Sequence, residues 1–353
     1  MDVHQALAEI VADTYLRGSG AGERIEVGAL SANYFSLTFP VDAVSDAGRH
    51  GVFVKIPKAD VRLSGHQIFP ITASDRQMAD DEVGSLRTLA TEWPLDELGV
   101  SFVTIRGFHA DHNAIVTDRV YAAEALDVLR RLDLQRRTGR AAGGRRLVDI
   151  LGRFGAALGR FHQRGAADAP FDALRAVPKL LRYCGELARM TRSALPHRAA
   201  AALSARDWPA MLGREASTLK GIDLRNLLID EADRVFLLDP GRMKRSFREA
   251  DLARFLLTYR ILYWGHWLFA AGCEPDGAGE ARFLASYYAN SAPASKGMLE
   301  FYLVKEVLKH WHTAHASLGL KTWRPLVKRA VGAAYIDRFY ERQLSAALER
   351  LFA

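Results

Sequence analysis

The sequence predicts an α+β chain of two lobes, in which a small sheet-rich lobe precedes a large, mainly helical one. Short runs rich in β-branched and aromatic residues, bounded by Gly, Pro and Asp, occur at residues 25–61 and 100–121. Helical spacing of apolar residues dominates after Tyr121. A strand–turn–strand pattern at residues 226–241 interrupts the helical region. Few folds combine these elements in this order.

The first lobe is expected to hold an antiparallel sheet and one helix. Residues 25–43 and 50–61 have the composition of strands, and so do residues 100–108 and 113–121. Between them, residues 74–90 have helical spacing, with Ser74 or Asp75 as the expected N-cap. We place the first lobe at residues 1–118 and the second at residues 119–353.

The second lobe is expected to be helical apart from the hairpin at residues 226–241. Helical patterns cover residues 147–165, a stretch to about Leu212, and the chain from Asp251 onward. An arginine-rich patch at residues 130–146 favours a solvated face or a mobile loop. The alternative is that this patch and further basic residues beyond the hairpin form a basic surface that attracts an anionic acceptor or a membrane. Those residues are Arg242, Lys244, Arg245 and Arg248.

Composition limits the partners and the location. The 353 residues are 49% hydrophobic, and a net charge of +7 favours anionic ligands. No nucleic-acid-binding module is recognisable, so nucleic acid is an unlikely partner. Two cysteines cannot make a disulfide framework, which indicates a reducing compartment such as the cytoplasm.

Two apolar segments are expected to belong to the globular lobes. Acidic residues interrupt the first 18 residues, which favours an amphipathic helix over a signal peptide. Arg260 and His266 interrupt the apolar stretch at residues 255–272, which favours a buried helix over a membrane span. Peripheral contact with the inner face of a membrane is the alternative to a purely cytoplasmic location.

A lysine in an apolar strand is the first candidate site residue. Lys55 lies in GVFVKIPK, where an ammonium group is costly to bury without a partner. Glu82 in the following helix is the expected partner, although Asp80 and Asp81 compete for that role. Such a pair orients an ammonium group toward nucleotide phosphates. The alternative is a surface lysine at a strand end, and Lys58 is expected to be replaceable.

The flanks of the predicted hairpin carry oxygen ligands for a cation. In KGIDLRNLLIDEADRVFLLDPGR, Asp223 and Asn226 precede the first strand and Asp239 follows the second. A tight turn brings the outer ends of two strands together, so Asn226 and Asp239 can share one divalent cation. Gly241 permits a sharp turn after Asp239. A surface hairpin with turn-forming residues at its ends is the alternative.

Two weaker patterns complete the candidates. The segment GALSANYFSLTF has backbone amides and the hydroxyls of Ser31 and Ser36 as possible phosphate donors, although an ordinary hairpin fits equally well. Five histidines have tolerable metal-ligand spacing, but no H-E-x-x-H arrangement accompanies them, so helix histidines are favoured over zinc ligands. They are His109, His112, His310, His312 and His315.

The order of these motifs resembles that of the protein-kinase-like superfamily, in its branch of aminoglycoside and choline phosphotransferases and lipopolysaccharide kinases. That branch has H-G-D-x-x-x-x-N-I-L-x-D, then a strand ending I-D-F-G or I-D-P-x. This chain has G-I-D-L-R-N-L-L-I-D, then F-L-L-D-P-G. LGRFHQRG and EADLARFL are similar to its L-A-x-L-H and D-L-A segments. The resemblance covers residues 25–256.

The resemblance implies an ATP-dependent kinase that phosphorylates a hydroxyl of a small molecule or glycan, with GTP as the alternative donor. The excess of basic over acidic residues favours an anionic acceptor. Asp223 would orient or deprotonate the acceptor hydroxyl, and Asn226 with Asp239 would hold Mg²⁺. The first lobe would bind the nucleotide, and the second would hold the catalytic loop, the metal and the acceptor. The implied nucleotide-binding residues are Lys55, Glu82, Ser31 and, at an adenine-binding hinge, Thr117, Asp118, Arg119 and Val120.

Other implied roles and departures concern the second lobe. His162 and Asp251 would brace the helices. Gly221 replaces the usual His, and Asp223 precedes Asn226 by three residues and not five. Such a loop moves the acid relative to the metal, and Lys220 or Arg225 is an alternative phosphate contact. A pseudokinase or nucleotide-binding scaffold, and an enzyme that transfers AMP, are the rival functions.

Overall fold

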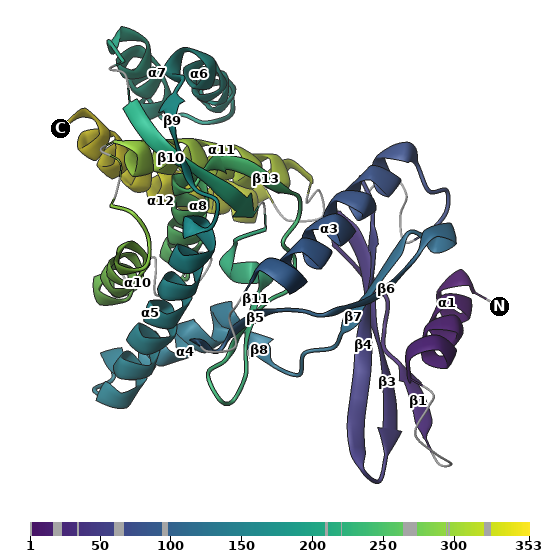
Figure 1. Ribbon diagram of the computed structural model, residues 1–353. Coiled ribbons are helices and arrows are strands. Elements are labelled where there is room, and N and C mark those ends of the chain that lie inside the picture. The colour runs from purple at the N-terminus through teal and green to yellow at the C-terminus, as the bar shows by residue number, and fades with distance from the viewer. Residues whose placement is uncertain are drawn as a thin grey trace. The chain divides into compact units, whose positions relative to one another are not determined.

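The N-terminal strands form an antiparallel sheet in the order β1-β3-β4-β7-β6, with β2 paired to β3 (Figure 1). Its strands are β1 (Arg24–Val27), β2 (Ser31–Ala32), β3 (Ser36–Ser45), β4 (Gly48–Pro57), β6 (Ile105–His109) and β7 (Ala114–Asp118). This computed structural model describes residues 2–16, 23–33, 35–59, 67–93, 98–208, 211–219, 221–263, 274–293, 295, 297–320 and 326–353.

Each face of this sheet is covered by one helix. Helix α1 (Val3–Val11) and the π-helical turn η1 (Ala12–Leu16) pack on the face that carries Phe39 and Val54. Helix α3 (Ala73–Glu92) packs on the other face, against Ile115. Because side chains alternate along a strand, Lys55 points toward the α3 face while Val54 points toward α1. Helix α1 buries Leu7, Ala8 and Val11 against the sheet and exposes polar residues, so the expected amphipathic N-terminal helix is present.

Helix α3 begins earlier than predicted. Its N-cap is Thr72, not Ser74 or Asp75. Asp75 is the third helical residue, and its carboxylate accepts from the backbone of Thr72 at 2.9 Å while Thr72 Oγ1 accepts from the Asp75 N–H at 3.1 Å. This reciprocal capping box satisfies two donors, which a cap at Asp75 itself cannot do.

A second small sheet has the order β5-β12-β11-β8. Its strands are β5 (Val100–Phe102), β8 (Ala123–Glu124), β11 (Leu227–Ile229) and β12 (Val235–Leu237). The predicted hairpin is confirmed, because β11 pairs antiparallel with β12. Its turn is fixed by Asp230, whose carboxylate accepts from the N–H groups of Ala232 and Arg234, and by Asp233, which has φ 61°.

The chain divides into two compact units. The sheet unit comprises Met1–Val128, Leu219–Ile222 and Asn226–Met243, and the helical unit comprises Leu129–Thr218, Asp223–Arg225 and Lys244–Ala353. The predicted α+β class, with an antiparallel-sheet region before a mainly helical one, is confirmed. The lobe boundary at residue 118 stays a prediction.

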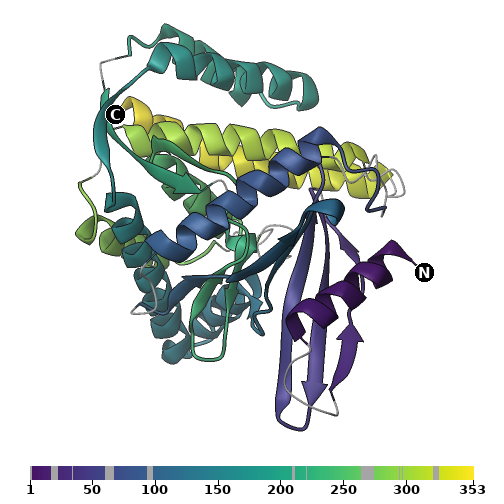
Figure 2. The same cartoon turned by 45° about the vertical axis from the view of Figure 1, so that its right-hand side comes forward.

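In the helical unit, α5 packs against α10, and α11 packs against α6, α8 and α12 (Figure 2). The helices are α5 (Ala141–Gln163), α6 (Ala173–Met190), α7 (Leu195–Ala205), α8 (Glu249–Arg260), α10 (Gly277–Ala289), α11 (Met298–Leu320) and α12 (Leu326–Phe352). Helix α4 (Ala125–Arg137) precedes α5, and short 3₁₀ turns η3 (Ala110–His112) and η4 (Leu224–Asn226) lie in loops.

A three-stranded sheet in the helical unit was not predicted. It has the order β13-β10-β9, with β9 (Ala167–Phe171), β10 (Met211–Leu219) and β13 (Met243–Phe247). The sequences ADAPF and MLGREASTL contain few β-branched residues, so they carry little strand signal. Most of the arginine-rich patch is helical, because it lies in α4 and at the start of α5. Within α4, Arg136 and Arg137 pair with the buried Asp133 one turn earlier.

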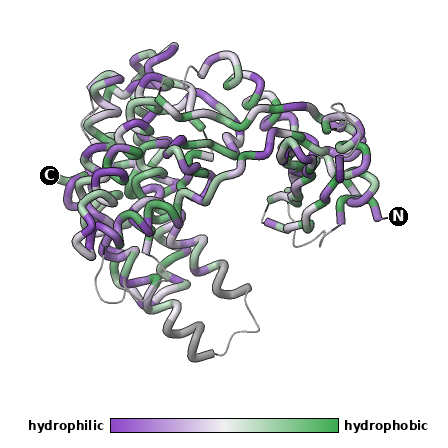
Figure 3. Tube along the Cα trace, turned by 90° about the horizontal axis from the view of Figure 1, so that it is seen from below, coloured by the Kyte–Doolittle hydropathy of each residue, from purple (hydrophilic) through white to green (hydrophobic). Residues whose placement is uncertain are grey.

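No described helix is long and apolar enough to cross a membrane. Hydrophilic residues interrupt the hydrophobic ones along the helices (Figure 3). In the predicted buried helix at residues 255–272, the residues up to Tyr263 are buried except for the half-buried Arg260, where α8 ends. Residues 264–273, which include His266 and Cys273, lie outside the described part of the chain, whereas Cys184 is a buried free thiol.

Candidate functional site

One lysine of the sheet unit contacts two carboxylates. The Nζ of Lys55 on β4 lies 2.8 Å from Oε1 of Glu82 on α3 and 2.7 Å from Oδ2 of Asp239, which follows β12. The Lys55 and Glu82 side chains are 16% and 9% exposed, whereas that of Asp239 is 36% exposed. The expected pairing of Lys55 with Glu82 is therefore present, and the Asp239 carboxylate faces solvent beside it.

The charges of this group are strongly coupled. Burial lowers the pKa of Lys55, but the charges of Asp239 and Glu82 outweigh burial and hold that pKa above its ordinary value. Burial and the Asp239 charge raise the pKa of Glu82 to about 7, against the opposing effect of Lys55. Two carboxylates share one ammonium here, so the group favours additional positive charge.

The backbone around Asp239 is held in a tight arrangement. Oδ1 of Asp239 accepts from the N–H of Gly241 at 2.8 Å, and Gly241 has φ 58°, a conformation that glycine adopts without strain. On the other side, the N–H of Gly221 donates to the Pro240 carbonyl at 3.0 Å. A Cβ atom at Gly221 would lie 1.6 Å from the Asp239 carbonyl oxygen. The predicted turn at Gly241 is thus present, and the absence of His at position 221 has a steric reason.

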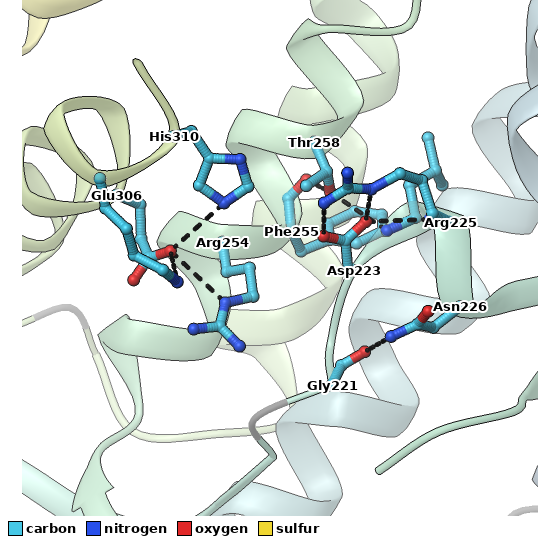
Figure 4. Close-up of polar contacts among 11 residues, drawn as sticks. Gly221, Asp223, Arg225, Asn226, Arg254, Phe255, Thr258, Glu306 and His310 are labelled. Atoms are coloured by element: carbon cyan, nitrogen blue, oxygen red, sulfur yellow. Dashed lines mark hydrogen bonds and ion pairs between the residues drawn. The ribbon is translucent and has the colours of Figure 1, made fainter. Parts of the chain in front are cut away.

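Asn226 lies at the same end of the hairpin as Asp239. The N–H of Leu238 donates to the Asn226 carbonyl at 2.9 Å, which joins the two outer ends of the strands. The Asn226 amide nitrogen donates to the Gly221 carbonyl at 3.0 Å (Figure 4). Because that nitrogen is used, the amide oxygen is the end of the side chain that can ligate a cation. One carboxylate and one amide oxygen suit Mg²⁺, which takes its remaining ligands from phosphates and water.

Ser31 shares a row across the sheet with Lys55. Ser31 pairs with Thr38, and Thr38 pairs with Lys55. Residues directly opposite one another point to the same face, so all three side chains lie on the α3 face. The segment around Ser31 is a short β2–β3 pairing, as the hairpin alternative expected, and Ser36 is buried.

Of the expected hinge residues, Thr117 and Asp118 end β7, and Arg119 and Val120 follow it. The N–H of Asp118 donates to Thr104, and the N–H of Arg119 donates to Gly51, so both are used within the sheet unit. The Asp118 carboxylate accepts from Arg106 at 2.5 Å. Val120 packs against the core cluster under α3 and has no backbone hydrogen bond to another described residue. The contact of the Val120 backbone with an adenine stays a prediction.

Asp223, in the helical unit, is bound by its own neighbour. Arg225 donates to Asp223 through Nε at 2.8 Å, through Nη2 at 2.5 Å and through its backbone N–H at 3.0 Å (Figure 4). Burial raises the pKa of Asp223, but the hydrogen bonds and charge of Arg225 outweigh burial and hold it below the usual range. Arg225 is thus committed to Asp223, and Lys220 lies outside the described residues.

Three contacts brace the segment that contains Asp223 and the helices near it. The N–H of Leu224 donates to Thr258 Oγ1 of α8 at 3.1 Å. The buried His162 of α5 contacts Asp251 of α8 at 3.1 Å and the Tyr287 hydroxyl of α10 at 2.9 Å. His162 and Asp251 thus join three helices, as their expected bracing role requires.

The structure corrects the expectation for Lys58 and places three of the histidines. Lys58 is 2% exposed and its ammonium donates to the Pro70 carbonyl at 2.7 Å, so it is a structural residue and not a replaceable one. The histidines His310, His312 and His315 each face a different carboxylate. In the described part of the chain, no group of three or more His, Cys, Asp and Glu side chains is placed to hold a metal.

No protein-family model and no curated protein matches this sequence. Among solved structures, choline kinase LicA from Streptococcus pneumoniae matches with a TM-score of 0.52 and 14% identity over 98% of each chain. A Ralstonia eutropha protein assigned as an aminoglycoside phosphotransferase matches with a TM-score of 0.51 and 12% identity over 98% of each chain. The chain therefore has the bilobal fold of the protein-kinase-like small-molecule kinases, and the predicted resemblance is confirmed at the level of the fold.

Proposed function

We propose that this chain is an ATP-dependent phosphotransferase that phosphorylates a hydroxyl of an anionic small molecule or glycan. The observation that carries the proposal is the contact of Lys55 with both Glu82 and Asp239. A lysine held by a helix carboxylate next to a metal-binding aspartate is the arrangement that phosphoryl transfer needs, because catalysis there depends on positioning and charge.

In this proposal Lys55, oriented by Glu82, binds the nucleotide phosphates. Asn226 and Asp239 hold Mg²⁺, which neutralises phosphate charge when bound. The donors fit the cation, since the Asp239 carboxylate is partly exposed and already attracts an ammonium. Ser31 adds a hydroxyl on the same face of the sheet, and the Val120 backbone is the expected contact for the adenine.

Asp223 is the proposed partner of the acceptor hydroxyl. Its lowered pKa keeps it ionised at neutral pH, so it acts as a hydrogen-bond acceptor that orients the hydroxyl. The net charge of +7 supports an anionic acceptor. We place the activity in the cytoplasm, with peripheral contact at the inner face of a membrane if the acceptor is a membrane-borne glycan.

One observation favours a second function. Both carboxylate oxygens of Asp223 are bound by Arg225, and a carboxylate occupied in this way is less available to an acceptor. A nucleotide-binding scaffold without transfer activity is therefore the rival. The retained Asn226 and Asp239 support the enzyme, because a scaffold has no need of metal ligands.

Thermal melting with nucleotides tests the proposal. ATP with Mg²⁺ should raise the melting temperature by about 3 °C or more at saturation, since a ligand that binds the folded state stabilises it. Asp239→Asn should remove the Mg²⁺-dependent part because it deletes the ligand charge. Asp233→Asn, at the tip of the same hairpin, is the matched control and should retain it. If neither ATP nor GTP changes melting of the wild type, the nucleotide-binding function is wrong.

Transfer separates the enzyme from the scaffold. Incubation with γ-labelled ATP and a panel of acidic sugars and sugar phosphates should yield a labelled product whose formation requires Asp239. Nucleotide binding without any labelled product across the panel and a cell extract would favour the scaffold.

A further inference from the structure

A group of basic side chains surrounds α11 in the helical unit and has no part in the proposed nucleotide and metal site. Helix α11 packs against α6 and α8, and the Tyr302 hydroxyl on α11 bonds Ser246 of β13, so all three elements lie next to α11. We call this group the α11 basic cluster. Its members are Lys305 and Lys309 of α11, Lys179 of α6, Lys244 of β13 and Arg254 of α8.

Glu306, the carboxylate that pairs with two cations of the cluster, is already surrounded by positive charge. Glu306 is 2% exposed, and its Oε2 lies 3.4 Å from Arg254 Nε, 3.0 Å from Lys309 Nζ and 3.6 Å from His310 Nε2 (Figure 4). Burial raises the pKa of Glu306, but its hydrogen bond to His310 and the surrounding cations outweigh burial and hold that pKa well below its usual range. Glu306 therefore neutralises Arg254 and Lys309 at most in part.

Lys305, like Lys179 and Lys244, has no ion pair with another described residue, whereas Arg254 and Lys309 pair with Glu306. The partly buried ammonium of Lys305 lies 4.7 Å from the centre of the Tyr302 ring. Burial lowers its pKa to about 8, against the opposing charge of Glu306, and the charges of Lys179, Lys244 and Lys309 act in the same direction as burial. A half-buried ammonium among like charges is costly, and a bound anion offsets that cost with charge-assisted hydrogen bonds.

The cluster borders the residue proposed to orient the acceptor. Within the helical unit, Asp223 interacts electrostatically with His310 and with Lys309. Because Asp223 is itself neutralised by Arg225, it does not cancel the charge of Lys305. An anionic group held by the cluster would therefore sit in the same unit as Asp223, beside the proposed position of the acceptor hydroxyl.

We propose that the α11 basic cluster binds a phosphate or carboxylate group of the acceptor, with Lys305 as its principal ligand and Lys309 and Lys244 beside it. The acceptor would then be a polyol that carries an anionic group, such as a sugar phosphate or an acidic sugar. That the anion belongs to an acceptor rests on the proposed function, whereas anion binding by the cluster does not.

Titration of inorganic phosphate into the full chain tests the cluster directly. Lys305→Gln should weaken phosphate binding about tenfold or more, because it removes the principal charged donor. Arg198→Gln on α7 removes an equal charge from an exposed position of the same unit and should change the affinity less than about twofold. Lys55→Met removes the proposed phosphate ligand of the sheet unit and should leave the Lys305-dependent binding in place.

The outcomes separate the two proposals. Equal phosphate affinity in the wild type and Lys305→Gln overturns the cluster, while Mg²⁺–ATP melting results would still support the kinase. Lys305-dependent phosphate binding without any nucleotide effect supports the cluster and contradicts the kinase. Vesicles with and without anionic phospholipid form the last arm. Lys305-dependent binding to anionic vesicles, with no binding of free phosphate, would assign the cluster to lipid headgroups and overturn the acceptor.

Discussion

At Lys55 a single ammonium lies between Glu82 and Asp239, and the three side chains together carry one negative charge when all are ionised. The raised pKa of Glu82 is the consequence, because a buried carboxylate next to another carboxylate is hard to ionise. Cation binding at Asp239 would relieve this repulsion. The same residues therefore link nucleotide binding to the protonation of Glu82.

This linkage predicts a pH dependence of stability. The pKa of Glu82 is about 7 in the folded chain and near 4.5 when unfolded. Between these values the folded state binds more protons, so the contribution of Glu82 to stability is full below pH 4.5 and is lost as pH rises through 7. Glu82→Gln should reduce the fall in unfolding free energy between pH 5 and pH 8 by about 1–3 kcal/mol.

Denaturant unfolding at several pH values measures this effect. Asp80→Asn removes an exposed carboxylate from the same helix and should leave the wild-type pH profile intact. Identical profiles for the wild type and Glu82→Gln would mean that Glu82 does not titrate in this range.

Asp223 and Asn226 should give different phenotypes. Asp223→Asn should keep Mg²⁺–ATP affinity and lower transfer about 10²-fold or more, since an amide cannot accept the acceptor's proton as a carboxylate does. Asn226→Ala should weaken the Mg²⁺-dependent affinity about tenfold, because it deletes a ligand. Nucleotide titrations with and without Mg²⁺ measure both. A loss of Mg²⁺-dependent binding in both variants would assign Asp223 to the metal, and full activity of Asp223→Asn would contradict its role.

Among the elements, the segment Leu219–Ile222 and the end of β12 determine each other's position. The backbone of Gly221 bonds Pro240 and Asn226 and leaves no room for a side chain beside Asp239. The end of the hairpin that carries the proposed metal ligands is thus held largely by contacts of the Gly221 backbone. The sequence motif alone shows only that Gly221 stands where the resembling kinases have His.

A substitution at this contact should disturb both stability and binding. Gly221→Ala places a methyl group 1.6 Å from the Asp239 carbonyl oxygen, so the backbone must move, and we expect a loss of about 1–3 kcal/mol in unfolding free energy. Mg²⁺–ATP affinity should fall as well. Gly185→Ala in α6 meets no atom within 4 Å and should stabilise the chain slightly. Wild-type stability and affinity for Gly221→Ala would show that the loop relaxes freely.

For the whole molecule, local patterns predicted the order of elements and the residues that pair across short distances. The hairpin and the Lys55–Glu82 pair follow from strand alternation, turn chemistry and the cost of a buried ammonium. The capping of α3 was misplaced because Thr72 and Asp75 act together, and Lys58 was misjudged because its acceptor, Pro70, lies in a loop with no local signal.

Some of the contacts that the sequence could not reveal join distant elements. The α11 basic cluster draws residues from α6, α8, α11 and β13, which are up to 130 positions apart. The pairing of Arg225 with Asp223 was equally hidden, because two residues in a loop adopt a geometry that spacing does not define. β9, β10 and β13 were missed since their sequences contain few of the residues that favour strands.

The sheet unit is discontinuous along the chain, and this affects how the protein can be made. Residues Asn226–Met243 complete a sheet whose other strands, β5 and β8, end by Glu124. During synthesis on the ribosome those two strands must wait for about a hundred more residues, five seconds or longer at roughly 5–20 residues per second. A gene fragment that ends at Val128 would encode neither Asp239 nor the partners of those strands. Expression of this unit by itself therefore requires the hairpin to be fused back onto the N-terminal fragment.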